Sequence, residues 1–429
     1  MSSLPPQDKE RETGLPFDDG AGNTRADTGI DGELSPDEIF YWLSHPPMPT
    51  DEELAAVHPA VARSWRVRPI PNPPPEWDGY CRRDMGPEVL KFLYDFLAIE
   101  EEWSVQEQRG FCWWPDRLRQ VIRALPPVRQ ERFLLTRILI CSDFLRDVPD
   151  TPQTLEVLDK LNHTTVMHSY VWDRTRKRIK LLSVGVVHEG NAGWVSVVLS
   201  AAMAIQAEMA GKLATSIAEM IGAAPDCTHH PSRGPRPEPH PCLEFIKKCY
   251  LPFGLLPSRF GQKWLERAAM MFRSQGLLAN AGEAGLTAEL PFYGSKSAMQ
   301  SLFEELLGVA DHSPLQTSLF QCWPHIAHPV LGNGMVAILR LPCSISNSLE
   351  PRRRFVTHLN RAWRHRLLIA PRLGAWCLPP SYPIPSYVMF VPNYLGWEGI
   401  IEWVGQQFAV ISKLALQELF RFAAVDPME

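Results

Sequence analysis

The pattern of apolar and polar residues predicts an α+β fold built on antiparallel sheets. Apolar side chains alternate with polar residues or proline over residues 286–292, which is typical of a half-buried strand. Near the C-terminus, apolar residues recur at spacings of three, four or seven from Ile401 to Phe422, the pattern of a long amphipathic helix. A second long apolar helix is expected from Trp194 onward.

The remaining elements are expected in the same order in both halves of the chain. In the first half we predict a helix over 89–99, strands near 111–122 and 133–141, a helix after Thr151-Pro152, and strands over 169–173 and 180–187. In the second half we predict a tight turn at Gly332–Gly334, a strand over 335–341, a helix from Pro351, and strands over 373–377 and 387–391.

Landmarks in the two halves also recur in the same order, roughly 200 residues apart. The matched pairs are Tyr94–Leu97 with Phe303–Leu306, Trp114-Pro115 with Trp323-Pro324, Leu161-Asn162 with Leu359-Asn360, Trp172 with Trp376, Asn191 with Asn393, Trp194 with Trp397, and Leu213-Ala214 with Leu414-Ala415. We therefore predict two duplicated units over 86–222 and 275–425. Each would be an antiparallel sheet with helices packed on it and a long C-terminal helix.

The segments outside these units differ in composition. Residues 1–54 carry 13 Asp or Glu against 3 Lys or Arg, and before Ser35 they are rich in proline, glycine and aspartate. Such a composition predicts a largely disordered arm, with a short helix over 36–44. Residues 223–274, rich in proline and histidine at their start, are predicted to be a linker with connecting helices.

Charge, cysteine content and hydropathy exclude several classes of protein. The net charge of −5 does not favour a general polyanion binder, and the nine scattered cysteines are typical of reduced thiols in the cytoplasm. The most apolar stretch, Val195–Ala210, is interrupted by Ser196, Gln206 and other polar residues, so we expect a buried helix and no membrane span. We predict a cytoplasmic protein.

Three local sequences carry a resemblance to a known family. They are Gly110-Phe111-Cys112-Trp113-Trp114-Pro115, Ser142-Asp143-Phe144-Leu145-Arg146-Asp147-Val148 and His188-Glu189-Gly190-Asn191-Ala192-Gly193-Trp194. With the predicted order of elements, they resemble uncharacterised bacterial proteins that carry two type III secretion chaperone-like domains, a fold also found in the sensory-transduction-regulator family. The resemblance covers about residues 86–222 and 275–425. It implies binding of unfolded or partner protein segments and no catalytic residues.

Candidate chemistry is sparse. Phosphate-binding, dinucleotide-binding, nucleophile-elbow and zincin motifs are absent from the sequence. A weak zinc candidate is formed by Cys227, His229, His230, His240 and Cys242, although the one-residue spacing within each pair is shorter than zinc turns use. We expect no metal and no cofactor.

Other conspicuous residues have plain structural interpretations beside functional ones. His188-Glu189 is an acid–base pair or a structural histidine, and Asn191 and Asn393 are expected to cap the long helices. Most tryptophans are expected in the core, with Trp114, Trp194, Trp323 and Trp397 as partner-binding candidates. Two basic clusters, 174–180 and 352–366, are interpreted as a hairpin turn and a solvated helix face, so we do not expect nucleic acid as the partner.

The sequence thus predicts a non-enzymatic, chaperone-like protein-interaction module whose partner is another protein. The chain is expected to be a monomer with pseudo-twofold packing of its halves, or a homodimer. The alternative is an enzyme of unknown class with a site in the groove between the two copies, which would need titratable groups with shifted pKa values at that place.

Overall fold

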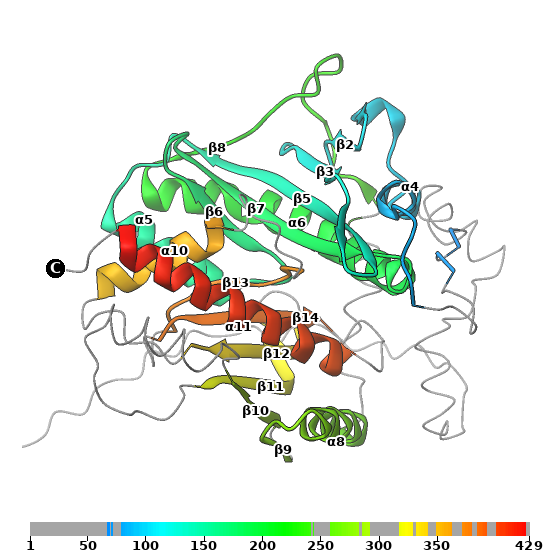
Figure 1. Cartoon of the computed structure of the whole chain (residues 1–429). Coiled ribbons are helices and arrows are strands. Elements are labelled where there is room, and N and C mark those ends of the chain that lie inside the picture. Colours follow the sequence, from blue (N-terminus) through cyan, green and yellow to red (C-terminus); the bar gives the residue numbers. More distant parts are fainter. Residues whose placement is uncertain are drawn as a thin grey trace, which may run out of the picture. The chain divides into compact units, whose positions relative to one another are not determined.

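The computed structural model describes most of the predicted domains. The residues described are 67–68, 70–71, 79–241, 243, 258–282, 285–291, 317–328, 332–341, 349–362, 371–379, 384–392 and 400–425. The predicted N-terminal arm and its helix at 36–44 lie outside these residues. Within them, two antiparallel sheets and their helices confirm the predicted α+β class (Figure 1).

The first half builds an eight-stranded sheet. Its elements are α4 (Gly86–Phe96), the 3-10 turn η1 (Glu101–Trp103), β1 (Ser104–Glu107), β2 (Gly110–Trp113), β3 (Gln120–Ala124), β4 (Val128–Gln130), β5 (Phe133–Arg146), α5 (Pro152–His163), β6 (Ser169–Asp173), β7 (Arg178–Val187), α6 (Ala192–Ile221) and β8 (Ala224–Pro225). The strand order is β1-β2-β3-β5-β7-β6, and β4 and β8 pair with β5. The single strand expected over 111–122 is in fact two, β2 and β3, separated by a turn.

The second half builds a six-stranded sheet. Its elements are α8 (Ser258–Ser274), β9 (Ala279–Gly282), β10 (Gly285–Pro291), β11 (Thr317–His328), β12 (Gly332–Arg340), α10 (Leu349–Ala362), β13 (Ala375–Cys377), β14 (Ser386–Pro392) and α11 (Ile400–Val425). The strand order, β9-β10-β11-β12-β14-β13, repeats the order of the first sheet. The predicted tight turn at Gly332–Gly334 is wrong, because these residues begin β12 and pair with β11.

An asparagine joins a helix to a strand in the same way in both halves. On α5, Asn162 Oδ1 accepts the backbone N–H of Tyr170 at 2.8 Å, and its Nδ2 donates to the carbonyl of the same residue at 3.2 Å. On α10, Asn360 makes the same two bonds to Trp376, both at 2.8 Å. The matched asparagines therefore occupy equivalent places, whereas Trp376 is equivalent to Tyr170 and not to Trp172.

The remaining landmark pairs agree less well with the topology. Trp114 follows β2, whereas Trp323 lies inside β11, the counterpart of β3. Phe303–Leu306, Asn393 and Trp397 lie outside the described residues. The strand order supports a common origin of the halves, and duplication stays a proposal.

The long helix α6 covers one face of the first sheet and is mostly buried up to Ala210, whereas its last three turns carry exposed residues (Figure 1). It is long and apolar enough to cross a membrane, but 83% of its most apolar window is buried inside the protein. Asn191 precedes it, and the predicted capping bond is wrong. Its side chain instead accepts the N–H of His188 and donates to the carbonyl of Val186.

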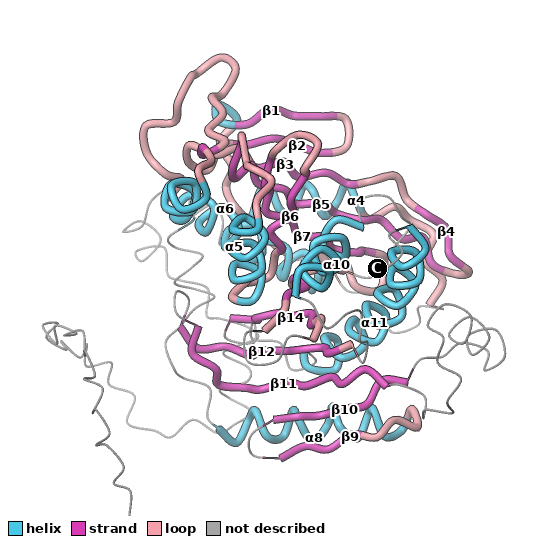
Figure 2. Tube along the Cα trace, turned by 90° about the vertical axis from the view of Figure 1, so that its left-hand side faces the viewer, coloured by secondary structure: helices cyan, strands magenta, loops and turns pink. Residues whose placement is uncertain are grey.

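The two halves contact each other reciprocally. Helix α5 of the first half packs on β13 of the second, and α10 of the second half packs on β6 of the first. Helices α5 and α10 also lie side by side, and β6 touches β13 (Figure 2). A backbone bridge joins Val184 to Arg372, with N···O distances of 2.9 and 2.7 Å. Equivalent elements exchange equivalent contacts, as in an isologous interface; we call this region the junction.

Candidate interaction surface

The face of the first sheet turned away from α6 carries a row of apolar side chains. Gln120, Ser142 and Ser183 point toward α6, where they bond to Gln206. Their strand neighbours therefore point to the opposite face, because side chains alternate along a strand. Register places three of these neighbours in one line across the sheet with Cys112 on β2 and Val105 on β1, and we call the five residues the apolar stripe: Val105, Cys112, Val121, Cys141 and Leu182.

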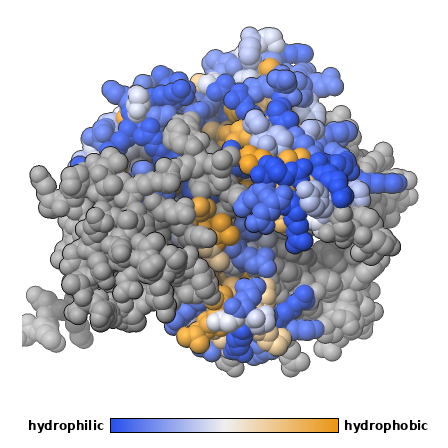
Figure 3. Space-filling view, viewed as in Figure 1, coloured by the Kyte–Doolittle hydropathy of each residue, from blue (hydrophilic) through white to orange (hydrophobic). Residues whose placement is uncertain are grey.

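Burial varies along the stripe. Val105 on β1 is 38% exposed and Val121 and Cys141 are partly buried, whereas Cys112 on β2 and Leu182 on β7 are only 7% and 3% exposed. At the β7 end, Leu414 of α11 packs on a cluster that includes Leu182. The second half thus closes one end of the stripe and leaves the β1 end accessible. Figure 3, drawn from the side shown in Figure 1, shows a band of hydrophobic side chains between hydrophilic ones.

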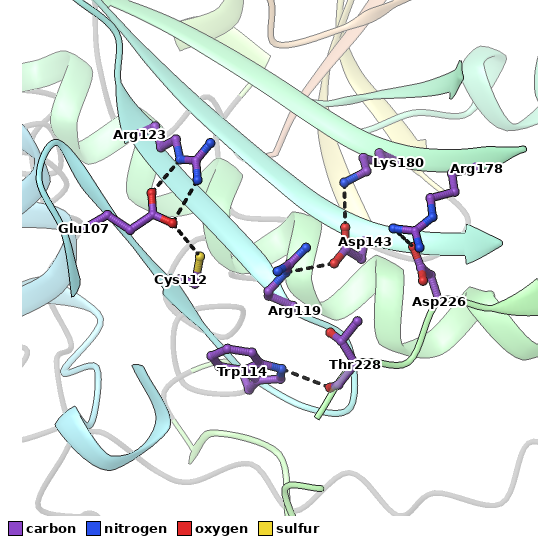
Figure 4. Close-up of polar contacts among 10 residues, drawn as sticks. All are labelled: Glu107, Cys112, Trp114, Arg119, Arg123, Asp143, Arg178, Lys180, Asp226 and Thr228. Carbon is purple, nitrogen blue, oxygen red and sulfur yellow. Dashed lines mark hydrogen bonds and ion pairs between the residues drawn. The ribbon is translucent and has the colours of Figure 1, made fainter. Parts of the chain in front are cut away.

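Two sets of charges border the stripe (Figure 4). On one side, Arg123 donates two bonds to Glu107, at 2.6 and 2.8 Å. On the other side, the fully buried carboxylate of Asp143 accepts bonds from Arg119 at 3.0 Å and Lys180 at 2.8 Å. Two cations and their N–H groups thus replace the water that the buried Asp143 carboxylate loses.

The thiols of this face and of the core are not activated. Burial, and then the nearby Glu107 carboxylate, raise the pKa of Cys112 to about 11. Burial likewise raises the pKa of Cys81, Cys322 and Cys377. A cysteine nucleophile needs the thiolate and therefore a lowered pKa. These thiols are protonated at neutral pH, and all six cysteines in the described part of the chain are free.

The segment 224–241, which we call the strap, packs on the first half beside this surface. Strand β8 pairs with the end of β5, and the indole N–H of Trp114 donates to the Thr228 carbonyl at 2.9 Å. The His230 ring lies edge-to-face on Trp114, with centroids 4.8 Å apart. His240 is buried against Trp113, and its backbone N–H donates to the carbonyl of Pro115.

The described zinc candidates therefore differ in their environments on the strap. Cys227 and His229 are exposed, whereas His230 and His240 are buried against tryptophans. Cys242 lies outside the described residues. No group of three or more metal-ligating side chains occurs in the described ranges.

An arginine secures the middle of the strap. The Arg236 guanidinium lies 5.1 Å from the ring centre of Trp103, pairs with the Glu100 carboxylate at 2.6 Å and donates to the Trp114 carbonyl at 3.1 Å. Only 5% of its side chain is exposed. Arg236 thus joins the strap to the first half through three different contacts.

Arg236→Ala is expected to release the strap from the first half. The change leaves the Glu100 carboxylate without its cation and should cost roughly 3 kcal/mol of local stability. Hydrogen exchange over residues 226–240 should rise strongly while β5 stays protected. Arg233→Ala is the matched control, since its guanidinium is 55% exposed and 3.5 Å from Glu102. Equal exchange in the two variants would contradict this role of Arg236.

The tryptophan candidates have different environments. Trp114 is buried under the strap, and Trp194 lies edge-to-face with Trp403 of α11, with centroids 5.1 Å apart. Trp323 is partly buried on β11 and points away from α11, because its neighbour Cys322 is on the buried face. Trp397 lies outside the described residues. Of the three described, only Trp323 lies on an outer sheet face.

His188-Glu189 has structural partners on the segment before α4. The Glu189 carboxylate accepts the backbone N–H groups of Arg82 and Arg83, and His188 Nδ1 lies 3.5 Å from the Cys81 sulfur. Burial lowers the pKa of His188, which keeps the ring neutral. The pair thus fastens residues 81–83 to the loop before α6.

In the described residues, acidic groups pair with some members of the two basic clusters. Residues 174–177 form the β6–β7 turn, as predicted, and Arg178 pairs with Asp226 at 3.5 Å. The predicted solvated face of α10 is wrong in part, because Arg353 is partly buried and acts electrostatically on Asp159 of α5. Arg364 and Arg366 lie outside the described residues.

Sequence reasoning missed the apolar stripe. Its five residues come from five strands, and only Cys112 belongs to one of the local sequences singled out above. Alternation within each strand was a usable signal, since it assigns Val121 and Cys141 to the face opposite Gln120 and Ser142. Comparison of the chain with protein-family models, with curated proteins and with solved structures finds no match.

Proposed function

We propose that this chain is a non-enzymatic, cytoplasmic protein-interaction module that holds a segment of a partner protein on the outer face of its first sheet. The observation that carries the proposal is the apolar stripe, which is bordered by ion pairs and in which Val105 is exposed and Val121 and Cys141 are partly exposed. Apolar centres with polar rims are typical of surfaces that bind proteins. In the described residues each half runs helix, strands, helix, two strands and long helix, the order on which the chaperone-like resemblance rests, but with more strands before the middle helix than expected.

One observation favours the enzyme alternative. At the junction, burial raises the pKa of Asp159 to about 6, lowers that of His163 and raises that of Cys377. Each shift, however, favours the neutral form of its group, and Cys377 is wholly buried. An acid–base site also needs a path by which the substrate reaches it. Because Cys377 is wholly buried, we keep the enzyme as the second candidate.

Val121→Glu is expected to abolish partner binding, because it puts a charge in the centre of the stripe. A displayed library of 12-residue peptides is first selected on the full-length wild-type protein. The enriched peptides should bind Val121→Glu at least tenfold more weakly than the wild type, as measured by fluorescence polarisation. Val105→Glu, at the exposed end, tests the same surface with little risk to folding.

Met220→Glu is the matched control, since Met220 is 53% exposed on α6, on the other side of the sheet. It should bind the enriched peptides like the wild type. Peptides that bind all three variants equally, or a library without any enriched peptide, would overturn the proposal.

A further inference from the structure

Two residues one turn apart on α5 contact two consecutive residues of the second half. The Asp159 carboxylate accepts the backbone N–H of Leu378 at 2.6 Å, immediately after β13. His163 Nδ1 lies 3.7 Å from the sulfur of Cys377. This part of the junction therefore places an acid and an imidazole against the end of one strand.

The charges around Asp159 do not compensate for its burial. Two charged groups act on Asp159: Glu156 on the same helix and Arg353 on α10. Burial and, in turn, the charge of Asp159 raise the pKa of Cys377 on β13. Burial outweighs the Leu378 N–H and Arg353, and raises the pKa of Asp159 to about 6. Burial also lowers the pKa of His163. The closed junction thus favours both groups in their neutral forms.

We propose that the junction is a pH-sensitive contact in which protonation of Asp159 tightens the packing of the two halves and protonation of His163 loosens it. When the halves separate, both side chains enter water and regain their ordinary protonation behaviour. Acidification from pH 7.5 to 5 neutralises Asp159 only in the closed form, which favours closure. It protonates His163 more readily in the open form, which favours opening.

Single variants of the full-length chain separate the two effects. In His163→Gln, the protection factor of the Leu378 amide, corrected for intrinsic exchange, should rise about tenfold from pH 7.5 to 5, given a shift of Asp159 from 3.8 to about 6. In Asp159→Asn, which keeps an oxygen acceptor for Leu378, protection should fall over the same range. The double variant should show no slope.

Two references keep the result specific to the junction. The Val121 amide on β3 reports global unfolding, and its protection is subtracted at each pH. Glu219→Gln is the control, because Glu219 is exposed on α6 and is not among the groups that act on Asp159 or His163; it should follow the wild type. Slopes of the same sign in the two single variants, or a pH slope that persists in the double variant, would overturn the proposal.

Discussion

Gln206→Ala is expected to destabilise the first half by about 3–5 kcal/mol, because this side chain joins three strands of the sheet to one helix. Gln206 is wholly buried on α6. Its Oε1 accepts from Ser142 at 2.8 Å and from Gln120 at 3.1 Å, and its Nε2 donates to Ser183 at 3.1 Å. Truncation opens a cavity and leaves polar atoms on three strands with fewer partners, where water cannot replace the lost bonds.

Urea denaturation followed by circular dichroism measures this loss. Ser216→Ala on the same helix is the control, because its hydroxyl is exposed and bonds only to the Leu213 carbonyl in the described contacts. That change should alter the free energy of unfolding by less than about 0.5 kcal/mol. A loss below about 1 kcal/mol for Gln206→Ala would show that the network contributes little to stability.

Asn162→Ala and Asn360→Ala are expected to destabilise their own halves by similar amounts, about 2–3 kcal/mol each. Each asparagine is buried and makes two bonds to the backbone of one strand residue. Removing either side chain leaves a buried N–H and a buried carbonyl unpaired. Because the geometry is the same in both halves, equal losses are the result that a shared ancestral module predicts.

Hydrogen exchange of the Tyr170 and Trp376 amides measures each loss locally. Gln262→Ala on α8 is the control, since its exposed side chain bonds only to Glu266 one turn away in the described contacts. It should leave both amides protected. If one asparagine variant destabilised its half and the other had no effect, the two helix–strand contacts would not be equivalent.

Local features of the fold could be predicted from the sequence. Strand β6 covers the predicted residues 169–173, and the Thr151 side chain caps α5 by accepting the Thr154 N–H at 3.2 Å. Both signals act over a few residues, through alternation and through a free helix amide. Strand β11 was not predicted, because polar residues and Pro324 interrupt its apolar pattern.

The equivalence of Tyr170 and Trp376 could not be predicted from matched residue types. The strand residue lies eight positions after the asparagine in the first half and sixteen after it in the second. The eight additional residues in the second half prevent a match when the two halves are compared at a constant spacing. The shared pair of hydrogen bonds reveals the equivalence only when the helix and the strand are seen packed together.

The sequence by itself determined most of the described helices and several of the strands, because propensity, periodicity and capping depend on near neighbours in the chain. The tertiary structure alone decided that Val105 and Leu182 lie in one row, that the strap covers Trp114 and that Asp159 meets Leu378. Strand register and the packing of the halves depend on contacts between distant residues, and a shift of one residue would turn the stripe to the opposite face.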